Sequence, residues 1–193
     1  MKQAVILHGT GNNPNEFWQP WLAQSLQHRG FAVLHPELPK NTTPNRQVYN
    51  DFLFDQDWDF TENVLFGHSS GATTVFNFLM DDRCPHIKAA VLIASFTELS
   101  PGIIDASWYE SGQFDHLFSP NGFDWEFIRS KCDAFYFVHG SDDPYCSIDV
   151  ARQICSELNG KFIVIDGGGH LGGSSDLTEL PSMLKLLEFD AVV

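Results

Sequence analysis

The chain has 193 residues, of which 43% are hydrophobic and 13% aromatic, and its formal net charge is −14. This length and apolar content suit one folded domain with a sizeable core and exclude a disordered chain. With 11 Lys and Arg and no basic run, nucleic acid is not an expected partner, because phosphate backbones are bound by clustered basic residues.

No apolar run approaches the roughly 20 residues that a membrane-spanning helix needs, so we expect no membrane span. The stretch of residues 1–8 is too short and too polar at its end for a signal peptide, and we interpret it as a first strand. We therefore expect a cytoplasmic protein. The cysteines form no C-x-x-C pair, and we expect reduced thiols in or near the core at Cys84, Cys132, Cys146 and Cys155.

Strand-like and helix-like segments alternate along the chain. Short apolar runs predict strands at residues 4–8, 31–34, 63–66, 89–94, 134–138 and 161–165. Residue patterns and end signals predict helices at residues 17–29, 48–55, 70–81, 147–158 and 177–189. Continuous apolar strands separated by helices are typical of a mostly parallel sheet covered on both faces. The sequence therefore predicts an α/β fold with three αβα layers and about six strands.

The segment Gly67-His68-Ser69-Ser70-Gly71 lies between a predicted strand and a predicted helix. G-x-S-x-G at such a junction is the pattern of a nucleophile elbow, in which a tight turn exposes the serine hydroxyl. The first N–H groups of the following helix can also stabilise an oxyanion. We predict that Ser69 is a nucleophile, the alternative being a Gly/Ser turn between two core elements. We interpret His68 as structural and expect it to project away from the pocket.

A serine hydroxyl needs an adjacent base, and the base needs a group that orients it. In this architecture the partners follow in the order serine, acid, histidine, each just after a strand. The glycine-rich loop after the sixth strand carries His170, the predicted general base. Asp142 and Asp143 both follow the fifth strand. We favour Asp143 because Pro144 restricts its backbone, and Asp142 would then satisfy the loop.

An oxyanion hole needs two donors. We expect one to be the backbone N–H of Ser70 and the other to come from the loop after the first strand, with Thr10 the choice by position and Gly11 next. The same loop faintly resembles the dinucleotide fingerprint G-x-G-x-x-G, but Pro14 stands where the third glycine would be. The histidines are dispersed and form no H-E-x-x-H, so we predict neither a cofactor nor a metal.

Residues 96–131 interrupt the alternation of strands and helices. They hold many aromatic side chains among Ser, Gly, Pro and Asp, and they lie between the fourth and fifth strands. One interpretation is a small lid-like insertion that covers a substrate pocket. The other is a surface loop with a helix, whose aromatics pack as a local core.

Several of these segments resemble a known family, the small alpha/beta-hydrolases that include the YdeN-like bacterial proteins and retinoblastoma-binding protein 9. The resemblance runs over nearly the whole chain and is carried by His8-Gly9, Trp18-Gln19-Pro20-Trp21-Leu22, Gly67-His68-Ser69-Ser70-Gly71, Ser141-Asp142-Asp143-Pro144 and Gly168-Gly169-His170. It implies a serine hydrolase with a shortened sheet, a single domain over residues 1–193 and no large cap domain. The family's nucleophile, acid and base fall on Ser69, Asp143 and His170.

The expected function is hydrolysis of a small-molecule acyl ester through an acyl-enzyme. Thioesters and amides are cleaved by the same machinery, so they stay open as substrates. The alternative is a catalytically weak hydrolase-fold protein that binds or regulates another protein, since a fold does not by itself establish an activity. No protein partner is indicated by the sequence.

Overall fold

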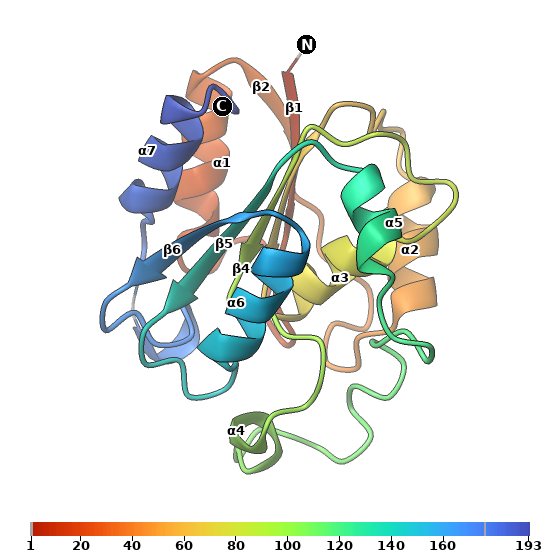
Figure 1. Ribbon diagram of the computed structural model, residues 1–193, viewed down its shortest axis with the longest axis vertical. Helices are drawn as coiled ribbons and strands as arrows, with labels where there is room; N and C mark the ends of the chain where they lie inside the picture. Colours follow the sequence, from red (N-terminus) through yellow and green to blue (C-terminus); the bar gives the residue numbers. More distant parts are fainter. Residues whose placement is uncertain (1, 176) are drawn as a thin grey trace.

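The computed structural model describes residues 2–175 and 177–193, which form one six-stranded sheet (Figure 1). The strand order is β2-β1-β3-β4-β5-β6, and every neighbouring pair is parallel. The strands are β1 (Lys2–Leu7), β2 (Phe31–Leu34), β3 (Val64–His68), β4 (Ala89–Ile93), β5 (Phe135–Gly140) and β6 (Lys161–Ile165). The predicted strands and their parallel arrangement are confirmed.

Helices cover both faces of this sheet (Figure 1). One face carries α1 (Gln19–His28) and α7 (Pro181–Phe189). The other carries α2 (Arg46–Phe54), α3 (Ser70–Leu79), α5 (Trp125–Ser130) and α6 (Ile148–Glu157), while α4 (Pro101–Ile104) lies beyond the end of the strands. Within the described residues the longest helices have ten residues, which is too short to span a bilayer.

The core consists of one apolar layer on each side of the sheet. Along β1, Val5 and Leu7 belong to the apolar layer under α2, α3 and α6, whereas Ala4 and Ile6 belong to the layer under α1 and α7. This alternation follows from the two-residue period of a strand. Because both faces are buried, the central strands are apolar at nearly every position, which is why they appear in the sequence as continuous runs.

Three helix starts differ from the sequence prediction by two residues or more. The helix predicted from residue 48 begins at Arg46, and the other two starts are marked by proline. The last helix begins at Pro181 rather than at residue 177, and α1 begins at Gln19 rather than at Phe17. Both the last helix and α1 have a proline in the first turn, where a backbone N–H would have no partner within the helix in any case. Phe17 has a φ of 55°, which is outside the right-handed helical region. Proline therefore marks these starts better than apolar periodicity does.

Residues 96–131 contain α4 and α5, and four of their side chains form an apolar cluster with Cys146 from the loop after β5, namely Phe96, Ile103, Phe114 and Leu117. Two buried side chains of α3 bond the backbone of this segment. Thr73 Oγ1 donates to the carbonyl of Phe96 at 2.6 Å, and Asn77 Nδ2 donates to that of Leu117 at 2.8 Å. The segment is thus fixed to the same helix that starts at the predicted nucleophile.

Candidate active site

Ser69 lies in the turn between β3 and α3, with φ 55° and ψ −123°. A residue other than glycine is rarely found there, and such strain gathers at functional sites. Glycines flank the turn because the backbones pass very close together. A Cβ added to Gly67 would lie 2.4 Å from the carbonyl oxygen of Gly71, and one added to Gly71 would lie 2.4 Å from that of Leu7. The geometry is that of the sharp turn expected for a nucleophile elbow.

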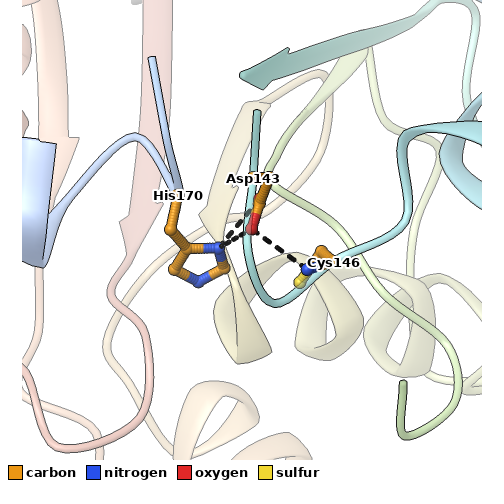
Figure 2. A group of neighbouring side chains, drawn as sticks. All are labelled: Asp143, Cys146 and His170. Carbon is orange, nitrogen blue, oxygen red and sulfur yellow. Dashed lines mark hydrogen bonds and ion pairs between the residues drawn. The ribbon is translucent and has the colours of Figure 1, made fainter. Parts of the chain in front are cut away.

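A chain of hydrogen bonds joins the three residues predicted as nucleophile, base and acid. Ser69 Oγ lies 2.9 Å from His170 Nε2, and His170 Nδ1 lies 2.9 Å from Asp143 Oδ2 and 3.1 Å from Oδ1. Figure 2 shows the His170 ring and the Asp143 carboxylate facing each other from separate loops. A neutral His170 that donates from Nδ1 to Asp143 leaves Nε2 free to accept the serine proton.

The carboxylate of Asp143 is 1% exposed. Burial alone raises its pKa, but the hydrogen bond and charge of His170 and the backbone N–H groups of Cys146 and Tyr145 outweigh burial, so its pKa lies below the ordinary value. Those two N–H groups donate to Oδ1 at 3.0 and 2.9 Å. Asp143 is therefore ionised at neutral pH and held in a fixed orientation.

Asp142 faces a different partner. Its Oδ1 accepts a hydrogen bond from the backbone N–H of Gly169 at 2.8 Å, so it bonds the loop before His170 rather than the imidazole. In the structure, Asp143 therefore contacts the histidine ring and Asp142 contacts the loop before it.

The predicted oxyanion donors also lie next to each other. Thr10 Oγ1 donates to Ser70 Oγ at 2.8 Å, which joins the loop after β1 to the start of α3. Within the described residues, the backbone N–H groups of Thr10 and Ser70 donate no hydrogen bond. The N–H of Gly11, the second choice from the sequence, donates to the carbonyl of Asn41 at 3.1 Å and is occupied.

His68 is buried, but it does not project away from the pocket as expected. It lines the pocket, and its Nε2 lies 2.9 Å from the carbonyl oxygen of His170, with the two rings 5.2 Å apart. The pKa of His68 is lowered to about 3, mainly because the ring is buried and to a smaller extent because of the charge of the neighbouring His170. A neutral His68 donates from Nε2 to that carbonyl, so its role is to hold the His170 loop. The turn brings side chain 68 beside the loop, which the motif alone did not predict.

Two buried residues next to Asp143 were missed by the sequence reasoning. His139, at the end of β5, has its Nδ1 3.9 Å from Asp143 Oδ2, and burial lowers its pKa. Cys146 comes within 4.8 Å of both Asp143 and His170 through its side-chain sulfur (Figure 2). Burial raises the pKa of this thiol well above its ordinary value, so it stays protonated and is a weak metal ligand. In the sequence, the only signal for these two residues is their position, with His139 in β5 and Cys146 in the loop after it.

Ser69 and His170 open into a pocket of about 400 Å³. Segment 96–131 contributes five lining residues, namely Phe96, Ile103, Trp108, Gln113 and Phe114. Thr10, Asn12 and Thr42 also line the pocket. Aromatic side chains of the segment therefore form a local core, and some of them also line the pocket. Tyr145 and Cys146, from the loop that carries Asp143, also line the pocket.

A parallel sheet with a strained serine between β3 and α3, and with an acid and a histidine after later strands, defines an α/β-hydrolase fold. A sequence model of the serine hydrolase family matches residues 4–189, and the chain belongs to that family. The predictions of a serine hydrolase and of a shortened α/β-hydrolase fold with a mostly parallel sheet are confirmed, and in the structure all six strands are parallel.

Similar proteins cover almost the whole chain. YdeN of Bacillus subtilis (strain 168) is 21% identical over 188 residues, which is 96% of this chain and 94% of YdeN. The crystal structure of the B. subtilis ydeN gene product has a TM-score of 0.85 at 19% identity and covers 98% of both chains. Est1E from Butyrivibrio proteoclasticus has a TM-score of 0.67 at 17% identity, covering 99% of this chain and 85% of Est1E. The resemblance to YdeN-like proteins is thereby confirmed.

Proposed function

We propose that this serine hydrolase cleaves small acyl esters through Ser69, His170 and Asp143, with an acyl-enzyme intermediate. The observation that carries the proposal is the unbroken hydrogen-bonded chain from Ser69 Oγ through His170 to the buried Asp143 carboxylate. Each distance in the chain is within hydrogen-bond reach, which is the geometric requirement for an activated nucleophile.

In the first half-reaction, Ser69 Oγ attacks the ester carbonyl while His170 Nε2 takes the hydroxyl proton. Asp143 keeps the ring oriented and stabilises the imidazolium that forms. The carbonyl oxygen becomes an oxyanion, which accepts hydrogen bonds from the backbone N–H groups of Thr10 and Ser70. His170 then donates its proton to the leaving alcohol. Water repeats the same steps on the acyl-enzyme, releases the acid and restores Ser69.

The pocket supports small, apolar acyl esters as substrates. Its volume of about 400 Å³ is near the lower end of the range for small-molecule sites, roughly 300–1,000 Å³. Phe96, Ile103 and Phe114 give it an apolar wall. A fold neighbour described as a carboxylesterase, with a TM-score of 0.69 at 15% identity, agrees with an ester as the substrate.

We also propose that residues 1–193 form one hydrolase domain and that segment 96–131 is a small lid-like insertion over its pocket. Gln113 Nε2 of this segment donates to the carbonyl of Thr42 at 2.7 Å. Both residues line the pocket, so the bond ties the segment to a residue outside it at the pocket.

The test is labelling of the purified protein with a fluorophosphonate probe, together with hydrolysis of p-nitrophenyl acetate and butyrate. We expect the wild type to be labelled and active, and Ser69→Ala and His170→Ala to lose both properties while keeping the wild-type circular dichroism spectrum. Ser130→Ala is the matched control, because Ser130 is exposed in α5 and its hydroxyl bonds only the carbonyl of Phe127 among the described residues. Labelling that persists in Ser69→Ala would refute this nucleophile. A folded wild type that is not labelled would favour the binding or regulatory role.

A further inference from the structure

Trp108 differs from the other aromatic residues of the pocket wall in its exposure. Its side chain is 42% exposed, whereas Phe96 and Phe114 are 4% and 2% exposed and belong to the local core. Isolated exposed aromatics are common on proteins. Trp108 is distinguished by its place, since it lines the pocket that contains Ser69 and His170.

The indole is also held in place. Its ring centroid lies 5.3 Å from that of Tyr145 at an interplanar angle of 83°, and 6.5 Å from that of Phe114 at 80°. Tyr145 in turn meets the His170 ring edge-to-face at 5.2 Å. Such T-shaped contacts are favourable for aromatic pairs. A ring that is already ordered presents a flat apolar surface to a ligand with little further loss of side-chain entropy.

The pocket offers hydrogen bonds but no charged partner. Among the described residues that line it, none is Asp, Glu, Lys or Arg, and the polar side chains in the lining include Asn12 and Thr42. The chain as a whole carries a net charge of −14. An anionic ligand would therefore lose its hydration without gaining a cation and would approach against a repulsive field.

We propose that the substrate is an uncharged ester that carries a flat aromatic group, and that Trp108 selects this group by stacking against it. The inference rests on the proposed esterase function and narrows it to a substrate class. Stacking on an aromatic side chain favours an aromatic ring over a saturated ring of similar size by roughly 3- to 10-fold.

The experiment compares kcat/KM for two pairs of esters. Ethyl phenylacetate and ethyl cyclohexylacetate differ in the ring on the acyl side, and benzyl acetate and cyclohexylmethyl acetate differ in the ring on the alcohol side. In the wild type, we expect the aromatic member to be preferred by about 3- to 10-fold in at least one pair, which also identifies the side that meets Trp108. Trp108→Leu should bring that ratio close to one. Ile104→Ala, an exposed change in the same segment, should leave it unaltered.

A ratio near one for both pairs in the wild type, or a preference that survives in Trp108→Leu, would overturn the role of Trp108. If Ser69→Ala is inactive in the same assays, the esterase proposal stands while this inference fails. A folded wild type that hydrolyses p-nitrophenyl acetate but none of the four esters would overturn this inference alone, and one that hydrolyses neither would overturn both. Ethyl 4-carboxyphenylacetate should react at least about tenfold more slowly than its neutral carboxamide analogue. Equal rates would show that the substrate need not be uncharged.

Discussion

The side chain of Asp142 accepts a hydrogen bond from the backbone N–H of Gly169 at 2.8 Å, one residue before His170. The end of β5 also approaches the loop that carries His170. A Cβ added to Gly140, the last residue of β5, would lie 2.0 Å from the carbonyl oxygen of Gly169. Consecutive carboxylates therefore have separate roles. Asp142 fixes the loop that carries the histidine, and Asp143 contacts the histidine ring itself.

Replacing each acid by its amide separates these two roles. Asp143→Asn removes the charge opposite the imidazolium and favours the wrong tautomer of His170, so we expect kcat to fall by roughly 10⁴-fold, as in other serine triads. Asp142→Asn keeps an oxygen that can accept from Gly169, so we expect a loss of about tenfold or less. Steady-state kinetics on p-nitrophenyl acetate measure both variants. A larger loss for Asp142→Asn would identify Asp142 as the acid.

The hydrogen bond from Thr10 to Ser70 joins the two loops whose N–H groups are the proposed oxyanion donors. Thr10→Val and Ser70→Ala each remove this bond, and each should lower kcat by roughly 2- to 12-fold, because the donors lose their mutual alignment. The double variant should be no slower than the slower single variant, since the same bond is lost in all three. Losses that multiply in the double variant would show that the two side chains act independently.

The residues that could be predicted from the sequence are those marked by a short local pattern. Ser69 and its flanking glycines form a contiguous motif, and Asp143 and His170 follow directly after strands that their apolar runs identify. Trp108 and His139 could not be assigned in this way. Trp108 reaches the pocket through the irregular course of segment 96–131, which has no periodicity to interpret, and His139 lies beside Asp143 only because β5 continues to Gly140.

The backbone of Ser69 stores strain that glycine would relieve. At φ 55° and ψ −123°, a side chain is disfavoured, and such residues cost of order 1–3 kcal/mol. Glycine loses more chain entropy on folding, which offsets part of this gain. We expect Ser69→Gly to be more stable than Ser69→Ala by about 1 kcal/mol in urea denaturation.

The control for this comparison is Ser156, an exposed residue of helix α6 with no special backbone geometry. There the order should reverse, with Ser156→Gly less stable than Ser156→Ala by about 0.5–1 kcal/mol. If Ser69→Gly were also less stable than Ser69→Ala, the side chain at position 69 would not strain the turn.

Burial of His68 makes stability depend on pH in a defined window. Its pKa in the folded protein is about 3, against about 6.5 in an unfolded chain. Between these values the unfolded state binds more protons, so stability is fully present above pH 6.5 and decreases as the pH falls toward 3. From pH 7.5 to pH 5.0, His68 should account for a loss of about 2 kcal/mol.

His68→Gln removes this titration while keeping a polar side chain beside the His170 carbonyl. Burial also lowers the pKa of His35 and His139, so the wild type should lose more unfolding free energy than the contribution of His68 alone. Asp143 titrates below this pH window, because its pKa lies under its ordinary value. Urea denaturation at pH 7.5 and 5.0 should therefore show a smaller loss of unfolding free energy for His68→Gln than for the wild type, by about 2 kcal/mol. An equal loss in both proteins would mean that His68 does not stay neutral in the folded state, and the hydrogen bond to the His170 loop would then have to be made by an imidazolium.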